Sequence, residues 1–247
     1  MLNPFTDGDD YALHRPDYPD RLAPLLAALP ARRHRALDVG CGTGQLTGQL
    51  APLIDTVTGI ALSPGQLAAA TPAPTVTYAV ADATTLPLAD ASIDLITVAQ
   101  AAHWIDLPAF YREVDRVAAP GAALALVNYG ICHLDDPALD QLYREFYHGD
   151  FHRFWDPTRR HVENGLRDLP FPYQEVTVEC PPIVRQHRLA HFLGYLGTWS
   201  ASKRARETGH GEELAAFARH LAGRWGDPDQ PRTVTWPVTV RAGIVRG

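Results

Sequence analysis

Three glycines at alternate positions follow a short apolar run that ends in an aspartate. The glycines are Gly40, Gly42 and Gly44, and the aspartate is Asp38. Glycine tolerates positive φ and lets a ligand approach the backbone where a Cβ would obstruct it. A helical pattern follows, and the amino end of a helix offers unpaired N–H groups and a positive dipole end. The stretch therefore predicts a site for a nucleotide-like ligand at the carboxyl end of a parallel strand.

The spacing of these glycines separates two kinds of nucleotide. The dinucleotide fingerprint requires a glycine three residues after Gly42, and the chain has Gln45 there. A dinucleotide site also needs an acidic residue after the second strand, and none follows residues 56–60 at that place. Both departures disfavour an NAD-dependent oxidoreductase.

Alternating apolar runs and helical patterns surround the glycine turn. Ser63 and Gln66 form a capping box with proline at the first helical position, so a helix is expected from Pro64 onward. Strands are predicted at 35–39, 56–60, 75–80, 93–99 and 123–129, with helices at 20–30, 44–53, from Pro64, and from Asp106 to Pro120. This alternation is typical of right-handed βαβ units in a parallel sheet.

The pattern changes after residue 130. Residues 134–169 read as helices, which form either an ordinary cover or a lid that binds an acceptor. A strand is expected at 174–180, helices at 189–198 and 212–225, and a last strand at 233–244. Pro237 lies inside that last strand and cannot donate to a ladder, so a bulge or a weakly paired edge is expected there.

The ordered motifs resemble those of class I S-adenosylmethionine (SAM)-dependent methyltransferases. Asp38-x-Gly40-x-Gly42-x-Gly44 matches the first motif of that family, and the others are Thr58 to Ser63, Asp82-Ala83, Ile93 to Ile96 and Pro120-Gly121. Three local groups are similar to the trans-aconitate methyltransferase-like subgroup: Arg15-Pro16-x-Tyr18-Pro19, Gln100-x-x-His103-Trp104 and Thr198-Trp199-Ser200.

The resemblance implies an α/β fold with a Rossmann-like, doubly wound, seven-stranded sheet, a terminal antiparallel strand and a helical lid insert. A single domain over residues 1–247 is expected, with helical inserts at about 134–170 and 181–230 that form the lid. The segment from Tyr11 to Tyr18 is either a packing arm or part of a lid over the cofactor.

The resemblance also implies SAM as cofactor and S-adenosylhomocysteine (SAH) as product. In that family the glycine turn contacts the methionine end, residues after the second strand contact the ribose, and the Asp-Ala pair lies by the adenine. The expected cofactor-binding residues are Tyr11, Arg15, Asp38, Gly40, Cys41, Gly42, Gly44, Ala61, Leu62, Asp82, Ala83, Gln100 and His103. Asp38 either orients the loop or binds the methionine amino group, and Asp82 either accepts from the adenine amine or caps a turn.

Ala61 departs from the family pattern, because an acidic residue usually holds the ribose hydroxyls at that position. Asp55 lies at the other end of the strand, roughly 17–20 Å away, and cannot substitute. Losing a charge-assisted hydrogen bond costs about 1.5–3 kcal/mol. Backbone groups, Ser63 or Gln66 are candidates to compensate. The outcomes are weak SAM binding, a different nucleoside ligand, or a family member without catalysis; we favour the first.

The acceptor decides whether methyl transfer needs a base. A carboxylate is already ionised at pH 7 and needs only a positive partner, for which Arg15, Arg159, Arg160 and Lys203 are candidates. A phenol, alcohol or amine benefits from a general base, and His103 is the candidate catalytic residue, with a contact in the cofactor pocket as the alternative.

Composition limits the partners and the compartment. The net charge of −6 argues against a nucleic-acid groove. Three distant cysteines show no zinc spacing and an odd count for disulfides, no metal site is expected, and no apolar run reaches the length of a membrane span. No signal-peptide pattern occurs near Met1. We expect a cytoplasmic monomer or homodimer.

The favoured function is SAM-dependent methyl transfer to a small molecule, either a carboxylic acid or a secondary metabolite. The alternative is a protein of the same fold that binds SAM or a related nucleoside and catalyses another reaction, or that only binds its ligand. Ala61 is the residue that keeps this alternative open.

Overall fold

The computed structural model describes residues 14–245 of the chain. Its main feature is a seven-stranded sheet in the order β3-β2-β1-β4-β5-β10-β7. The strands in that order are β3 (Val76–Val80), β2 (Thr56–Ala61), β1 (Arg35–Val39), β4 (Ile93–Ala99), β5 (Ala118–Tyr129), β10 (Val238–Ile244) and β7 (Gln174–Val176). The first five pair in parallel, and β10 pairs antiparallel with both β5 and β7. The predicted fold class is confirmed.

Helices cover both faces of the sheet. Alternate residues of β5 face opposite sides: Leu124 and Leu126 pack in one hydrophobic cluster, and Ala125 and Val127 in another. On the α/β half of the molecule, the helices are α2 (Leu22–Ala27), α3 (Gln45–Leu50), α4 (Pro64–Ala68), α5 (Leu107–Val117) and the 3-10 helix η1 (Ala102–Trp104). The cap of α4 is as predicted, since the Ser63 hydroxyl accepts from the Gln66 N–H.

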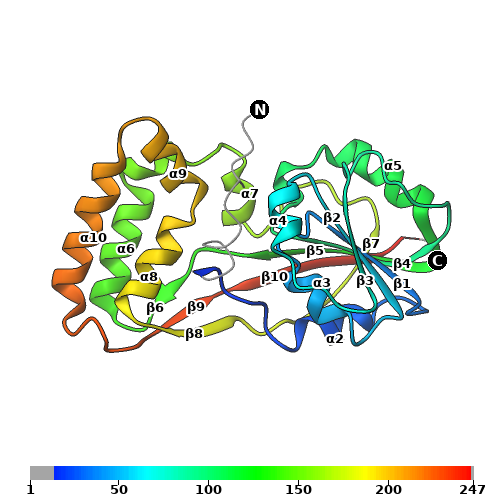
Figure 1. Cartoon of the computed structure of the whole chain (residues 1–247), viewed down its shortest axis with the longest axis horizontal. Coiled ribbons are helices and arrows are strands. Elements are labelled where there is room, and N and C mark those ends of the chain that lie inside the picture. Colours follow the sequence, from blue (N-terminus) through cyan, green and yellow to red (C-terminus); the bar gives the residue numbers. More distant parts are fainter. Residues whose placement is uncertain (1–13, 246–247) are drawn as a thin grey trace.

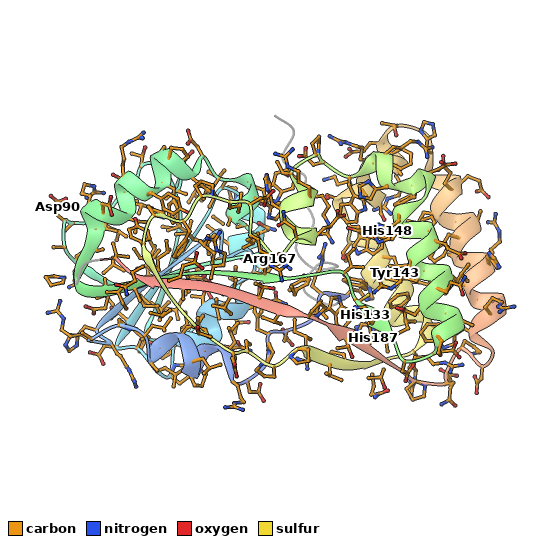
Figure 2. All side chains as sticks on the ribbon, turned by 180° about the vertical axis from the view of Figure 1, so that it is seen from behind. Asp90, His133, Tyr143, His148, Arg167 and His187 are labelled. Atoms are coloured by element: carbon orange, nitrogen blue, oxygen red, sulfur yellow. The ribbon has the colours of Figure 1, made fainter. Side chains whose placement is uncertain are left out.

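A second, helical half lies at the other end of the molecule (Figure 1). Its elements are α6 (Pro137–His148), η2 (Asp150–Phe154), α8 (Leu189–Gly197), α9 (Ser200–Glu207), α10 (Gly211–Trp225) and a three-stranded sheet of β6 (His133–Leu134), β9 (Arg232–Trp236) and β8 (Ile183–His187). The short helix α7 (Arg159–Glu163) lies between the two halves (Figure 1). Figure 2 places Tyr143 and His148 in this half and Asp90 at the far end of the α/β half.

The expected last strand at 233–244 is wrong as one strand. Pro237 divides it into β9, which joins the three-stranded sheet, and β10, which joins the seven-stranded sheet. Proline cannot donate to a ladder, but its carbonyl accepts from the Gly130 N–H at 2.9 Å. The break therefore connects the two halves instead of producing a bulge.

Two further strand boundaries differ from expectation, and two elements were not expected. β7 ends at Val176 instead of residue 180, and the unexpected elements are β8 and α9. β5 begins at Ala118, before Pro120-Gly121, and its register with β4 shifts between Ile93 and Leu95. The extra residues around this proline and the left-handed Gly121 are taken up by that irregularity.

Gly44 occupies a position that only glycine fits. It precedes α3 with φ +79°, and a Cβ there would overlap the Tyr78 hydroxyl. Gly48 lies four residues on, inside α3, and no described residue fills the space where its Cβ would lie. The two glycines are therefore near in sequence but differ in conformation and surroundings.

We expect Gly44→Ala to lower the free energy of unfolding by about 1–3 kcal/mol, because alanine resists positive φ and would displace Tyr78. The matched change Gly48→Ala should raise it by roughly 0.5–1 kcal/mol, since alanine is the better helix former. Urea unfolding of both variants measures the difference. Equal effects of the same sign would contradict this account of Gly44.

Candidate functional site

A large cavity opens at the carboxyl ends of the parallel strands. Its volume is about 980 Å³, and its walls come from the loops after β1, β2, β3 and β4. We call it the glycine-loop cavity. The sequence-predicted residues that line it are Asp38, Gly40, Cys41, Gly42, Ala61, Leu62, Asp82, Ala83 and Gln100. These residues are far apart in the sequence but lie together, because the carboxyl ends of parallel strands meet at one edge of the sheet.

Four predicted site residues lie elsewhere. Gly44 packs against Tyr78 and does not line the glycine-loop cavity. Arg15 and His103 line a neighbouring pocket instead. Tyr11 lies outside the described residues.

The glycine loop holds its shape through positive φ angles and close packing. A Cβ on Gly40, where φ is +67°, would lie 2.5 Å from the Ala101 Cβ. At Gly42, where φ is +57°, the nearest atom to such a Cβ is Gln66 Nε2 at 4.0 Å. Gly40 is therefore needed for packing, whereas Gly42 leaves room for a ligand beside the backbone.

Asp38 is buried at the end of β1, and hydroxyls bind both of its carboxylate oxygens. Thr47 Oγ1 donates to Oδ2 at 2.6 Å, and Thr97 Oγ1 donates to Oδ1 at 2.8 Å. Burial raises the pKa of Asp38 to about 6, against the lowering effect of these hydrogen bonds. Its side chain therefore ties the glycine loop to α3 and β4.

Asp82 is exposed at the other side of the glycine-loop cavity. Its Oδ1 accepts from both the N–H and the hydroxyl of Thr84, and these bonds lower its pKa. Asp82 therefore stays ionised and caps its own turn. Gln100 follows β4 and lines the same cavity. Its φ of +55° is strained for a non-glycine residue, and its Nε2 donates to the Tyr129 carbonyl.

The wall at Ala61 provides no carboxylate. Ala61 ends β2 and is buried, and the following Leu62 is 66% exposed. Behind them Ser63 and Gln66 are both buried and also line the glycine-loop cavity. The wall around Ala61 therefore offers hydroxyl, amide and backbone groups to a ribose.

A second pocket of about 480 Å³ adjoins the glycine-loop cavity. Arginine and lysine side chains dominate its charge, so we call it the cationic pocket; they are Arg15, Arg159, Lys203 and Arg206. Asp156 is its one carboxylate among the described residues. The walls that both spaces share are formed by Gln66, Gln100, Trp104, Asp156, Ser200 and Lys203. A molecule in one space can therefore reach a molecule in the other.

His103 lines the cationic pocket beside Trp104. Burial, the largest cause, and the charges of Arg159 and His161 together lower the pKa of His103 to about 3. Its Nδ1 is buried and has no hydrogen-bond partner among residues 14–245. His103 is therefore a neutral imidazole at pH 7.

Several residues of these walls were not singled out from the sequence. Trp155, Asp156, Gly197 and Arg206 come from the helical half, where helical periodicity reports burial and not ligand contact. The positive φ of Gln100 is a structural signal that no residue pattern displays.

Other kinds of site find no support in the described part. No helix between residues 14 and 245 is long and apolar enough to cross a membrane. Within the same range, no group of three or more His, Cys, Asp or Glu side chains could hold a metal ion.

The fold and the cavity define a Rossmann-like α/β protein with a nucleoside-sized site at the carboxyl edge of its sheet. A methyltransferase domain family profile matches residues 37–126. A Dictyostelium discoideum protein named as a methyltransferase is 31% identical over 193 residues, which are 77% of this chain and 73% of that relative. A Penicillium expansum O-methyltransferase is 36% identical over 159 residues, 60% of this chain and 55% of its own.

A solved structure from Anaeromyxobacter dehalogenans extends this likeness to the whole fold. That protein, named as a type II methyltransferase, is 43% identical, with a TM-score of 0.83 over 94% of this chain and 98% of its own. The chain belongs to the class I SAM-dependent methyltransferase family. It is a SAM-dependent methyltransferase, as the glycine spacing and ordered motifs predicted.

The residues of the glycine-loop cavity fit SAM. The space beside Gly42 admits a ligand against the backbone, and Asp82 keeps an ionised carboxylate on the far side. Thr43 Oγ1 is buried on the same wall and has no partner among the described residues, so it is available to a polar ligand group. SAM supplies a methyl group on a positively charged sulfur, which a nucleophile attacks directly.

We expect Asp38→Asn to change how stability depends on pH. The unfolded carboxyl has a pKa near 3.8 and the folded one near 6. Between these values the folded state holds a proton that the unfolded state has lost, so wild-type stability falls as pH rises from about 4 to 6. The free energy of unfolding of the wild type should fall by roughly 3 kcal/mol over this range, and that of the asparagine variant should not, because asparagine does not titrate. Urea unfolding at pH 4, 5, 6 and 7 measures it, and parallel curves would refute it.

Proposed function

We propose that this methyltransferase transfers the methyl group of SAM to a small molecule that carries a carboxylate. The observation that supports this most strongly is the cationic pocket. Arg15, Arg159, Lys203 and Arg206 contribute four positive charges to a space that shares a wall with the glycine-loop cavity. Positive side chains favour an anionic acceptor, and arginine pairs well with a planar carboxylate.

The chemistry of the transfer fits an ionised acceptor. An acceptor oxygen forms a bond to the methyl carbon while the sulfur–methyl bond breaks, and the electron pair of that bond stays on sulfur. A carboxylate oxygen needs no deprotonation at pH 7. The protein then contributes alignment and the exclusion of water.

His103 remains our candidate for a base only where the acceptor carries a proton. A pKa of about 3 makes its imidazole a weak proton acceptor. This agrees with an acceptor that is already ionised and favours a positioning role for His103 beside Trp104.

For the cofactor, we propose that the residues of the glycine-loop cavity bind SAM in the family manner. Gly42 and the loop around Asp38 would hold the methionine end, with Gly40 and Cys41 shaping the loop. Ser63 and Gln66 would serve the ribose beside Ala61 and Leu62, and Asp82-Ala83 and Gln100 would complete the wall. Gly44 would support the loop through its packing against Tyr78. Arg15 would contact SAM from the cationic pocket, and Tyr11 would contact it from the segment that precedes Arg15.

We propose further that the chain is one domain and that its helical inserts form the lid. α7 and α9 contribute Arg159, Ser200 and Lys203 to the pocket walls. Thr198-Trp199-Ser200 and Arg15, which suggested the trans-aconitate methyltransferase-like subgroup, line the same pocket. This position supports the assignment to that subgroup.

The proposed compartment is the cytoplasm, since three free cysteines agree with a reducing environment. The proposed oligomeric state is a monomer or a homodimer.

The direct test combines binding and turnover. SAH should bind the purified protein in calorimetric titration, and labelled methyl should pass from SAM to at least one acid among small mono-, di- and tricarboxylic acids. Binding of SAH without transfer to any acid would contradict the acceptor class. No heat and no thermal shift at millimolar SAH would contradict SAM as the ligand.

We expect Ala61→Asp to bind SAH about tenfold to a hundredfold more tightly than the wild type. The new carboxylate would accept from the ribose hydroxyls through charge-assisted bonds. Ala61→Asn is the matched neutral control and should gain less. Calorimetry at fixed pH and salt measures all three proteins. Unchanged affinity in Ala61→Asp would show that the ribose does not lie at this wall.

Gly197→Val should reduce methyl transfer on the order of tenfold and leave SAH affinity within about twofold. Gly197 lines the cationic pocket and not the glycine-loop cavity, and among residues 14–245 no neighbouring side chain lies within 4 Å of where its Cβ would be. The added methyl groups would therefore occupy acceptor space. Gly223→Val in α10 is the control, because Gly223 has equally open surroundings and lines neither space. Equal losses in both variants would contradict the acceptor assignment.

A further inference from the structure

We propose that Arg159 binds an anionic group of the acceptor and that this group is not the one that receives the methyl. The acceptor would then carry two functional groups: an anionic handle held by Arg159 and a separate nucleophile beside the cofactor. This inference rests on the proposed function, because it specifies how the cationic pocket recognises its acceptor.

Neighbouring aromatic side chains hold Arg159 in place. Its Nε donates to the Tyr147 hydroxyl at 2.7 Å, and that hydroxyl donates to Glu163 Oε1 at 2.7 Å. The guanidinium carbon lies 4.3 Å from the centre of the Trp155 ring, so one face of the group is covered. Tyr147 and Trp155 are both buried. Little side-chain freedom is left to lose when a ligand binds.

The outer edge of this guanidinium remains available. No residue among 14–245 accepts a hydrogen bond from its Nη1 or Nη2, and Arg159 lines the cationic pocket. Two parallel N–H donors on a fixed guanidinium match the two oxygens of a carboxylate. The arrangement is therefore that of a prepared anion site.

The other cationic side chains are engaged differently. Arg15 donates from Nη1 to the Tyr129 hydroxyl and from Nη2 to the Thr198 carbonyl. Arg206 donates from Nη2 to the Gly197 carbonyl. Arg160 is exposed, faces Asp168 and does not line the pocket. Of the three arginines that line the pocket, Arg159 is the one with both Nη atoms unengaged among the described residues.

Location separates the anionic handle from the reacting group. Arg159 lines the cationic pocket but not the glycine-loop cavity, whereas Lys203 and Gln100 line both. A carboxylate bound through both oxygens to Arg159 is a weaker nucleophile, because each oxygen shares electron density with an N–H donor, and it lies away from the shared wall. The methylated atom then belongs to a second group of the acceptor, near Lys203. Dicarboxylic acids satisfy this requirement, because their second carboxylate is also ionised at pH 7 and needs no base.

Calorimetric titration of malonate, succinate, glutarate and adipate tests the proposal. Each acid is added to the protein saturated with SAH and, separately, to the protein alone. We expect at least one acid to bind the wild-type SAH complex. In Arg159→Gln its affinity should fall about tenfold to a hundredfold, since two charge-assisted bonds are lost. Arg160→Gln, the adjacent arginine outside the pocket, should stay within about twofold of the wild type.

Tyr147→Phe provides a second measurement if Arg159→Gln fails to fold. It keeps the ring under the guanidinium and removes the acceptor of its Nε–H. As a positioning residue, Tyr147 should affect binding of the acid by roughly threefold to tenfold and leave binding of neutral glutaramide unchanged. A loss for both ligands would indicate general damage to the pocket and contradict a specific role.

The outcomes separate this inference from the proposed function. Failure of every acid to bind wild-type protein that does bind SAH would overturn the inference alone. Equal affinity in Arg159→Gln and wild type would do so as well, as would equal losses in the Arg159 and Arg160 variants. Absence of SAH binding would contradict the proposed function, and the titrations without SAH would still report on Arg159.

Discussion

The buried Asp38 carboxylate joins three segments that must meet for the cofactor edge to exist. It lies one residue before the end of β1, and the hydroxyls that bind its oxygens come from Thr47 in α3 and Thr97 in β4. The glycine loop between β1 and α3 is therefore fixed at both ends. A charge in this position costs stability, as the raised pKa shows. This cost falls at the residue whose hydrogen bonds fix the glycine loop.

A single proline lies at the junction between the two halves of the molecule. Pro237 ends β9 in one sheet and precedes β10 in the other, so one run of chain belongs to both. Side chains add a second connection, since Asn128 Nδ2 in β5 donates to the Val162 carbonyl in α7 at 2.9 Å. The helices that supply the cationic pocket are thus held to the sheet that supplies the glycine-loop cavity.

The α/β half could be predicted because its signals are local. The glycine loop, the Ser63 cap and the apolar strands each depend on neighbours within a few residues, and the structure places them as expected. The helical half depends on distant contacts, so β8, α9 and the division at Pro237 were missed.

The residues of the site were also only partly predictable, because pocket contacts depend on the direction in which a side chain points. Arg159 and Arg160 are adjacent and chemically identical, yet only Arg159 lines the pocket, because successive residues of a helix point about 100° apart.

Lys203 gives the shared wall a chemical identity of its own. It is the only lysine in the sequence, and every other basic side chain apart from the histidines is an arginine. An amine-selective reagent at alkaline pH therefore has one side-chain target, besides the terminal amine, and arginine does not compete for it. A label at this position would sit between the two ligand spaces and report on the occupancy of both from a single spectroscopic probe.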